Sequence, residues 1–170
     1  MQDEDDWDAA QEGAELIVEE AYEEAERVLE RLASEQPHNA YAFHFLGSAL
    51  FEQAKYGKAL RAYLTALELA PDYLGAMVGI GHTLRLIGRY NEAIRIAKQV
   101  LARDKQDQDA LFLLGSCHFA RGDNHAADQY LERFLQTHPE IEAATEAQGM
   151  LQVIRGNLEP AVAEDDELDN

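Results

Sequence analysis

Histidine and cysteine side chains carry most of the reactive chemistry that this sequence could offer. His44 and His82 could bind a metal ion through imidazole nitrogen, but such a site needs a third ligand, and the sequence indicates none. Cys117 and His118 are adjacent, so on a helix their side chains point apart and cannot form a thiolate–imidazole pair. We therefore expect no metal and no cofactor, and interpret His44 and His82 as hydrogen-bonding residues for a partner.

Catalytic motifs are also missing from the sequence. It contains no H-E-x-x-H, no G-x-x-x-x-G-K-[ST] phosphate-binding loop, no G-x-S-x-G nucleophile turn and no cysteine pair. The acidic runs Asp3–Asp6 and Glu164–Glu167 lack the glycine spacing of a calcium-binding loop. We predict that the protein is not an enzyme and has no catalytic residues.

Glycine recurs every 34 residues, and this period is the strongest signal in the chain. The glycines are Gly13, Gly47, Gly81, Gly115 and Gly149. Two further series keep the same period: Ala25, Ala59, Ala93, Ala127 and Ala161, and Pro37, Pro71 and Pro139 with Lys105 in the gap. A 34-residue period suits a helix–turn–helix unit, and copies of such a unit stack into a solenoid with a concave face. We predict an all-α superhelix whose concave face carries the function.

The recurring glycines need a physical cause, since glycine inside a helix costs about 1 kcal/mol relative to alanine. Close approach of the two helices of a repeat supplies one, with the periodic alanines on the facing surface. A side chain at Gly47, Gly81 or Gly115 would then push the two helices apart.

The period also divides the chain. Three complete repeats are predicted, at residues 40–73, 74–107 and 108–141. In the first, apolar residues at helical spacing predict helices over 40–53 and 56–69. Gly88 and Gly122 mark the turns between helices in the next two repeats, because a positive φ suits a helix end.

The two ends of the chain depart from this regular pattern. Residues 7–39 keep phase as a degenerate repeat, but no glycine marks its turn, so either one bent helix or two short ones fits. Residues 142–158 resemble a lone first helix and are expected to form a polar capping helix. The acidic segments 1–6 and 159–170 are expected to be disordered.

Charge is concentrated at the ends of this 170-residue chain, whose formal net charge is −19. Residues 1–35 hold 14 acids and 2 bases, and residues 159–170 hold 6 acids and no base. The 13 acids and 12 bases of residues 36–158 leave the repeats nearly neutral, with a basic stretch between Lys55 and Lys105. The acidic ends would repel nucleic acid, so we expect no nucleic-acid partner.

Cysteine content and hydropathy bear on the compartment. The single Cys117 cannot form an internal disulfide, which favours a reducing cytoplasm. No apolar run approaches the roughly 20 residues of a membrane span, and the acidic start does not resemble a secretory signal. We expect a cytoplasmic protein that does not insert into a membrane.

The repeat pattern resembles the tetratricopeptide repeat family, whose motif is W-x2-L-G-x2-Y, A-x3-F and P. The first copy reads Phe43-x2-Leu46-Gly47-x2-Leu50, Ala59-x3-Tyr63 and Pro71. The next two copies keep the frame and depart from the motif at Ala97, Lys105 and His118. In its arrangement of repeats, and in the sequence of residues 22–56, the chain also resembles the class II chaperones of bacterial type III secretion.

By this resemblance, the first helix of each repeat lines the concave face. The groove residues that the resemblance implies are Tyr41, His44, Phe45, Ser48, Phe51, Val78, His82, Arg85, Asp109, Phe112, Leu113, Ser116 and Phe119. Gly75 and Gly79 thin the middle helix and are expected to leave a pocket for a bulky side chain. Either burial in the core or exposure in the groove fits the four phenylalanines of this set.

The same comparison argues against a heat-shock co-chaperone. Family members that clamp chaperone C-terminal carboxylates use lysine, asparagine and arginine at set groove positions. The matching residues here are His44, Ser48, Gly79, Asp109 and Leu113.

We therefore predict a non-catalytic adaptor or chaperone that binds a segment of another protein in its groove. A role similar to that of the secretion chaperones is one possibility within this prediction. The alternative is a structural scaffold, whose copies assemble into homo-oligomers through the acidic N-terminal helix and the basic middle.

Overall fold

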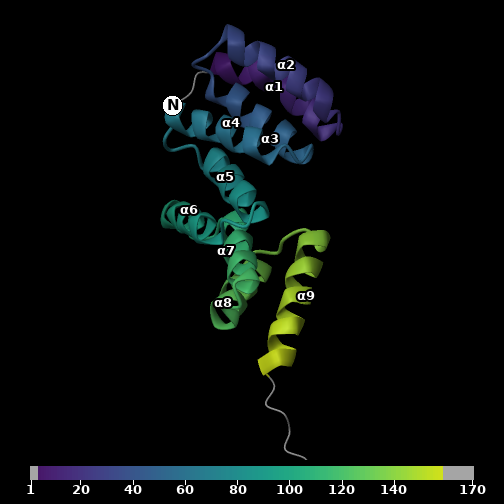
Figure 1. Cartoon of the computed structure of the whole chain (residues 1–170), viewed down its shortest axis with the longest axis vertical. Helices are drawn as coiled ribbons and strands as arrows, with labels where there is room; N and C mark the ends of the chain where they lie inside the picture. The colour runs from purple at the N-terminus through teal and green to yellow at the C-terminus, as the bar shows by residue number, and fades with distance from the viewer. Residues whose placement is uncertain (1–3, 159–170) are drawn as a thin grey trace, which may run out of the picture.

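A computed structural model gives the fold of residues 4–158. These residues form nine helices and no strand, which confirms the all-α prediction. The helices are α1 (Glu4–Val18), α2 (Tyr22–Glu35), α3 (Ala40–Glu52), α4 (Tyr56–Leu69), α5 (Leu74–Leu86), α6 (Tyr90–Arg103), α7 (Gln108–Ala120), α8 (Asn124–Leu135) and α9 (Ile141–Leu158). The first four pairs of helices follow one another along the long axis of the molecule, and α9 lies beside α7 and α8 (Figure 1).

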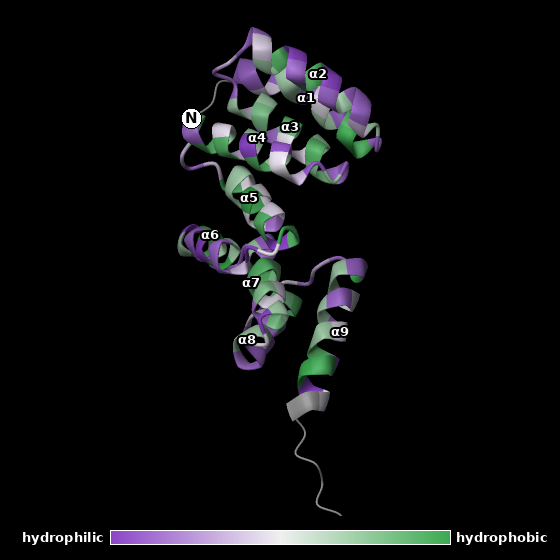
Figure 2. Ribbon diagram, in the orientation of Figure 1, coloured by the Kyte–Doolittle hydropathy of each residue, from purple (hydrophilic) through white to green (hydrophobic). Residues whose placement is uncertain are grey.

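The helices form two rows. The odd-numbered helices contact one another in the order α1, α3, α5, α7 and α9, and each even-numbered helix packs against the helices before and after it. The inner helices α5 and α7 are mainly hydrophobic in colour, whereas the outer helices α6 and α8 carry both hydrophilic and hydrophobic residues (Figure 2). This is the arrangement of a solenoid, in which the inner row of helices lines the groove.

The N-terminal region contains two helices, α1 and α2, which settles the open question about residues 7–39. The expected disorder of residues 1–6 is corrected in part, because α1 begins at Glu4; residues 1–3 lie outside the described part. Acidic side chains in the first turn favour a helix start through the helix dipole. In addition, the carbonyl of Asp6 accepts a hydrogen bond of 2.9 Å from Nδ2 of Asn39, a buried residue that also caps α3.

The turn within each of the first four helix pairs uses one residue with positive φ. The four residues again follow the 34-residue period: Glu20 (59°), Ala54 (58°), Gly88 (80°) and Gly122 (76°). Only two of them are glycines, which is why the sequence predicted only the later turns. The first two turns adopt the same conformation with residues for which it is strained.

The C-terminal helix α9 lies where a capping helix is predicted. Ala147, Leu151 and Ile154 are buried in a cluster with residues of α7 and α8. Its other side is polar or open, with Gln148, Gln152 and Arg155 exposed. The predicted tail 159–170, including Ala161, lies outside the described residues.

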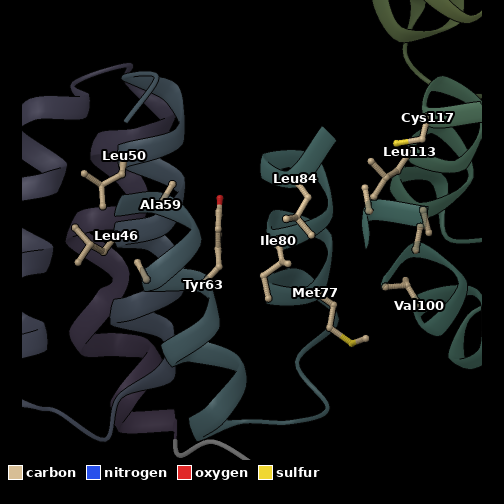
Figure 3. Close-up of a cluster of buried hydrophobic side chains, with 14 of the residues drawn as sticks. Leu46, Leu50, Ala59, Tyr63, Met77, Ile80, Leu84, Val100, Leu113 and Cys117 are labelled. Carbon is tan, nitrogen blue, oxygen red and sulfur yellow. The ribbon is translucent and has the colours of Figure 1, made fainter. Parts of the chain in front are cut away.

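Three of the periodic glycines, Gly13, Gly47 and Gly115, lie under bulky side chains of the second helix of their own repeat, which is the predicted contact. A Cβ atom built on Gly13 would lie 2.4 Å from Leu29, and one on Gly115 would lie 2.6 Å from Leu131. At Gly47 the neighbour is Tyr63, at 2.7 Å; Figure 3 shows this ring between α4 and α5. The described alanines of the second series are all fully buried: Ala25, Ala59, Ala93 and Ala127.

Gly81 does not make the predicted contact with the second helix of its own repeat. A Cβ atom there would lie 2.3 Å from Cδ2 of Leu113, which belongs to α7 and not to the second helix of the same repeat. The small residue at position 97 accounts for this different neighbour. Position 97 holds alanine, whereas the matching positions of the other repeats hold Leu29, Tyr63 and Leu131. Leu113, fully buried, occupies space that a larger residue at 97 would need.

Gly81 and Gly149 offer a matched test of this packing. No atom lies within 4 Å of a Cβ built on Gly149, so Gly149→Ala should raise the free energy of unfolding by about 0.5–1 kcal/mol through helix propensity. Gly81→Ala forces Leu113 to move and should lower the free energy of unfolding by about 1–2 kcal/mol. Urea unfolding of both variants measures the difference. Equal effects at the two positions would remove the packing explanation.

The turn residues offer a second test. Ala54→Gly should stabilise the protein by about 0.5–1 kcal/mol. The left-handed conformation costs a residue with a Cβ about 1–2 kcal/mol, and glycine avoids this cost. Part of the gain is lost because glycine makes the unfolded chain more flexible. Gly88→Ala should have the opposite sign. Thermal and urea unfolding would check both; a destabilised Ala54→Gly variant would contradict the conformational account.

Candidate binding groove

The inner helices surround a cavity of about 510 Å³ between α3, α5 and the start of α7. It is lined by residues from all three complete repeats: His44, Ser48, Phe51, Glu52, Tyr63, Leu74, Gly75, Val78, Gly79, His82, Asp107 and Asp109. The structure thus brings together six of the residues predicted for the groove: His44, Ser48, Phe51, Val78, His82 and Asp109.

Gly75 and Gly79 line this cavity, as predicted, but an aromatic ring uses part of the space they leave. A Cβ atom on Gly79 would lie 2.5 Å from the ring of Tyr63, which therefore packs between Gly79 and Gly47. The Tyr63 hydroxyl donates to Oγ of Ser48 (3.1 Å), and Ser48 donates to the carbonyl of His44 (3.2 Å). Burial raises the pKa of Tyr63 to about 12, so the phenol stays a neutral donor.

The imidazole of His44 lies in an aromatic cluster. Its centroid is 4.7 Å from that of Tyr73 and 5.7 Å from that of Tyr63. Burial lowers the pKa of His44 to about 4. Burial, with a smaller contribution from Arg85, also lowers the pKa of His82 to about 4. Both histidines are therefore neutral at pH 7.

Three of the lining residues are acids: Glu52 at the end of α3, and Asp107 and Asp109 at the start of α7. Asp107 caps α7, and its Oδ1 accepts a hydrogen bond of 2.8 Å from the backbone N–H of Ala110. Desolvation by the surrounding protein raises the pKa of both aspartates, although the Asp109 side chain is open to solvent on one side. Sequence reasoning missed Glu52 and Asp107, because both stand at helix ends, where acidic residues are common.

Tyr41 and Phe45 lie beside the cavity and pack against α1. The indole of Trp7 contacts both rings edge-on, at centroid distances of 5.2 and 5.6 Å. Trp7 is 44% exposed, so it extends the aromatic surface of the groove onto α1. It escaped the sequence analysis because it belongs to the degenerate repeat.

Arg85, Phe112 and Phe119, which are also predicted for the groove, do not line this cavity. The guanidinium carbon of Arg85 lies 6.0 Å from the Phe112 centroid, within the range of a cation–π contact. Phe112 and Phe119 are half-buried against the cluster that α8 and α9 share. These aromatic side chains are therefore partly core and partly surface, as are Phe45 and Phe51 against the main core.

Two predicted groove residues belong to the core instead. Leu113 is 0% exposed beneath Gly81, and Ser116 is 5% exposed with its hydroxyl donating to the Leu113 carbonyl. Leu113 packs over Gly81, where the other repeats place the residue that matches position 97, and neither buried side chain can reach a partner. Cys117 is buried nearby, and burial raises the pKa of its thiol to about 11, which keeps it protonated.

Residues 4–158 also lack two features. None of their helices has both the length and the apolar character needed to cross a membrane. Within the same residues, no three histidine, cysteine, aspartate or glutamate side chains converge as metal ligands.

Paired helices stacked in two rows around a groove define the class of α-solenoid repeat proteins. Two family models, both described as tetratricopeptide repeat, match residues 40–106 and 84–152 and together span most of the fold. The chain belongs to the tetratricopeptide repeat family.

Curated relatives match about half of the chain. Tetratricopeptide repeat protein 37 of Xenopus laevis is 30% identical over 82 residues, which are 48% of this chain and 5% of the relative. DnaJ homolog subfamily C member 7 of Homo sapiens is 30% identical over 94 residues, 55% of this chain and 19% of the relative. The chain thus spans at most about a fifth of the length of these relatives.

Solved structures match nearly the whole fold. MamA (41-end) from Desulfovibrio magneticus RS-1 has a TM-score of 0.73 at 19% identity and covers 93% of each chain. YrrB, described as a tetratricopeptide repeat protein with an unusual peptide-binding site, has a TM-score of 0.68 at 16% identity, over 86% of this chain and 74% of its own. At such identities the likeness shows the fold alone.

The two neutral histidines predict a pH dependence of stability. Their pKa is about 4 in the folded protein and about 6.5 when unfolded, so below pH 6.5 the unfolded chain binds more protons. Stability should therefore fall as the pH drops from 6.5 to 4, by up to about 3 kcal/mol for each histidine. Unfolding midpoints at several pH values measure this loss.

The double variant His44→Gln/His82→Gln should flatten that pH dependence, because glutamine does not titrate. His125→Gln, at an exposed position on α8, is the matched control and should leave the slope unchanged. An unchanged slope in the double variant would show that other groups carry the effect.

Proposed function

We propose that this protein is a non-catalytic interaction module, an adaptor or chaperone, that binds a segment of another protein in its inner groove. One observation carries the proposal: the open cavity between α3, α5 and α7 joins half-buried apolar side chains with polar groups at its edge. Such a mixture is typical of binding sites, in which apolar anchors supply affinity and a few polar groups fix orientation.

The aromatic surface next to the cavity supports an elongated ligand. Trp7, Tyr41 and Phe45 lie on one side of it, and Arg85 with Phe112 on the other. A segment along the inner row of helices would contact all three regions. Each large apolar side chain buried there contributes about 1.5–3 kcal/mol, so two or three anchors give useful affinity after the cost of ordering the segment.

Family membership supports a protein or peptide as the ligand. The similarity to a DnaJ homolog supports a chaperone role, although one without the carboxylate clamp, and the peptide-binding site of YrrB supports a peptide in the groove. The resemblance of residues 22–56 to secretion chaperones makes a secreted protein one candidate client. A cytoplasmic location, without nucleic-acid or membrane partners, belongs to the same proposal.

A self-assembling scaffold is the second candidate, and the charge distribution favours it. Residues 1–35 carry 14 acids, whereas Lys55 to Lys105 carries nine bases and four acids. The acidic N-terminal helices of one copy could therefore attract the basic middle of another.

Photocrosslinking in the native cell distinguishes these functions. A benzophenone amino acid at Val78, on the cavity wall, should form a crosslink to a different protein. The same group at Arg95, exposed on the outer helix α6, is the control and should not capture that protein. A crosslinked product of two copies of this chain would favour the scaffold, and crosslinks from position 95 alone would contradict the groove.

A further inference from the structure

The cavity is unusual in the signs of its charges. Its lining residues include three acids, Glu52, Asp107 and Asp109, and no lysine or arginine. The nearest cation on the inner row, Arg85, stands one turn beyond His82 and outside the lining. The two lining histidines are held neutral by burial, so at pH 7 the formal charge of the lining is negative.

These three acids form no ion pair among the described side chains, unlike Glu26 and Asp128. Glu26 binds Lys55 at 2.6 Å, and Asp128 binds Arg155 at 3.0 Å. No ion pair within residues 4–156 includes Glu52, Asp107 or Asp109. The raised pKa of both aspartates fits carboxylates that are partly desolvated without compensation by a cation.

Beside the acids, the cavity wall is aromatic and aliphatic. Phe51, Leu74 and Val78 line it together with the rings of Tyr63 and His44. The aliphatic stem of a lysine or arginine packs well on such a wall while its charged head reaches a polar edge, and aromatic faces attract cations. A volume of about 510 Å³ is ample for one such side chain and part of its backbone.

We propose that this cavity receives a lysine or arginine side chain of the bound partner segment, with its stem on Phe51 and Val78 and its charge at Glu52 and Asp109. The inference rests on the proposed function and specifies its partner: a protein segment that presents a basic residue flanked by apolar ones. Charge complementarity selects this occupant over an acidic segment, which the three carboxylates would repel.

A random peptide library tests the inference without a known partner. Twelve-residue peptides displayed on phage are selected on the full chain at low salt, and enriched peptides are synthesised with a fluorescent label. We expect lysine or arginine beside apolar residues in the enriched sequences. Replacing that basic residue by glutamine should weaken binding roughly tenfold, as should a rise in salt concentration.

Charge-neutral variants then locate the contact. Glu52→Gln/Asp109→Asn should bind the same peptides roughly tenfold more weakly, as measured by fluorescence anisotropy. The variant and the wild type should bind the glutamine-substituted peptide with about equal affinity. Glu23→Gln/Glu30→Gln removes two exposed acids from α2 and controls for net charge. Circular dichroism verifies that each variant is folded.

Each other outcome overturns a defined part of the proposal. The variant Ser48→Phe narrows the cavity and tests whether a peptide binds there. If the enriched peptides contain no basic residue but lose binding to this variant, the basic anchor is wrong and the groove function stands. Peptides that match the basic residues 55–61 of this chain would assign the cavity to a second copy. Failure to enrich any peptide would overturn the proposed function together with the anchor.

Discussion

The close contact between a bulky side chain and a helical glycine is the constraint on which the rest of the structure depends. Tyr63 shows it most clearly, because its ring packs between Gly47 of α3 and Gly79 of α5. A methyl group at either glycine would overlap the ring and separate the inner helices. The spacing of α3 and α5, and thus the width of the cavity between them, is set by one aromatic ring and two missing side chains.

The electrostatics of the cavity follow from the same packing. Because Tyr63 and Tyr73 surround His44, its imidazole is desolvated and stays neutral at pH 7. The carboxylates of Asp107 and Asp109 stand at the start of α7, where the helix dipole favours negative charge. An acidic cavity with neutral histidines is therefore compatible with stable helices and does not require strained residues.

The 34-residue period allowed the fold and the helix spans of the first complete repeat to be predicted, because the periodic glycines and alanines report local packing. Predictions failed where a residue's surroundings depend on a distant position. Leu113 turned inward because Ala97 is small, and α1 began early because Asn39 bonds to Asp6. The cavity at Gly75 and Gly79 was predictable, whereas its acids were not, since their convergence depends on how two repeats stack.

The contact pattern of the helices also bears on how the chain folds. Within residues 4–158, no helix touches another that is more than two places away in the sequence. Every contact is thus short in sequence separation, which is the property that makes helical proteins fold rapidly. Each repeat can form against the one before it while the chain is still being synthesised, and only the contacts of α7 and α8 with α9 have to wait for that helix. The half of the groove nearest the N-terminus, with its cavity, can then be complete before α9 leaves the ribosome.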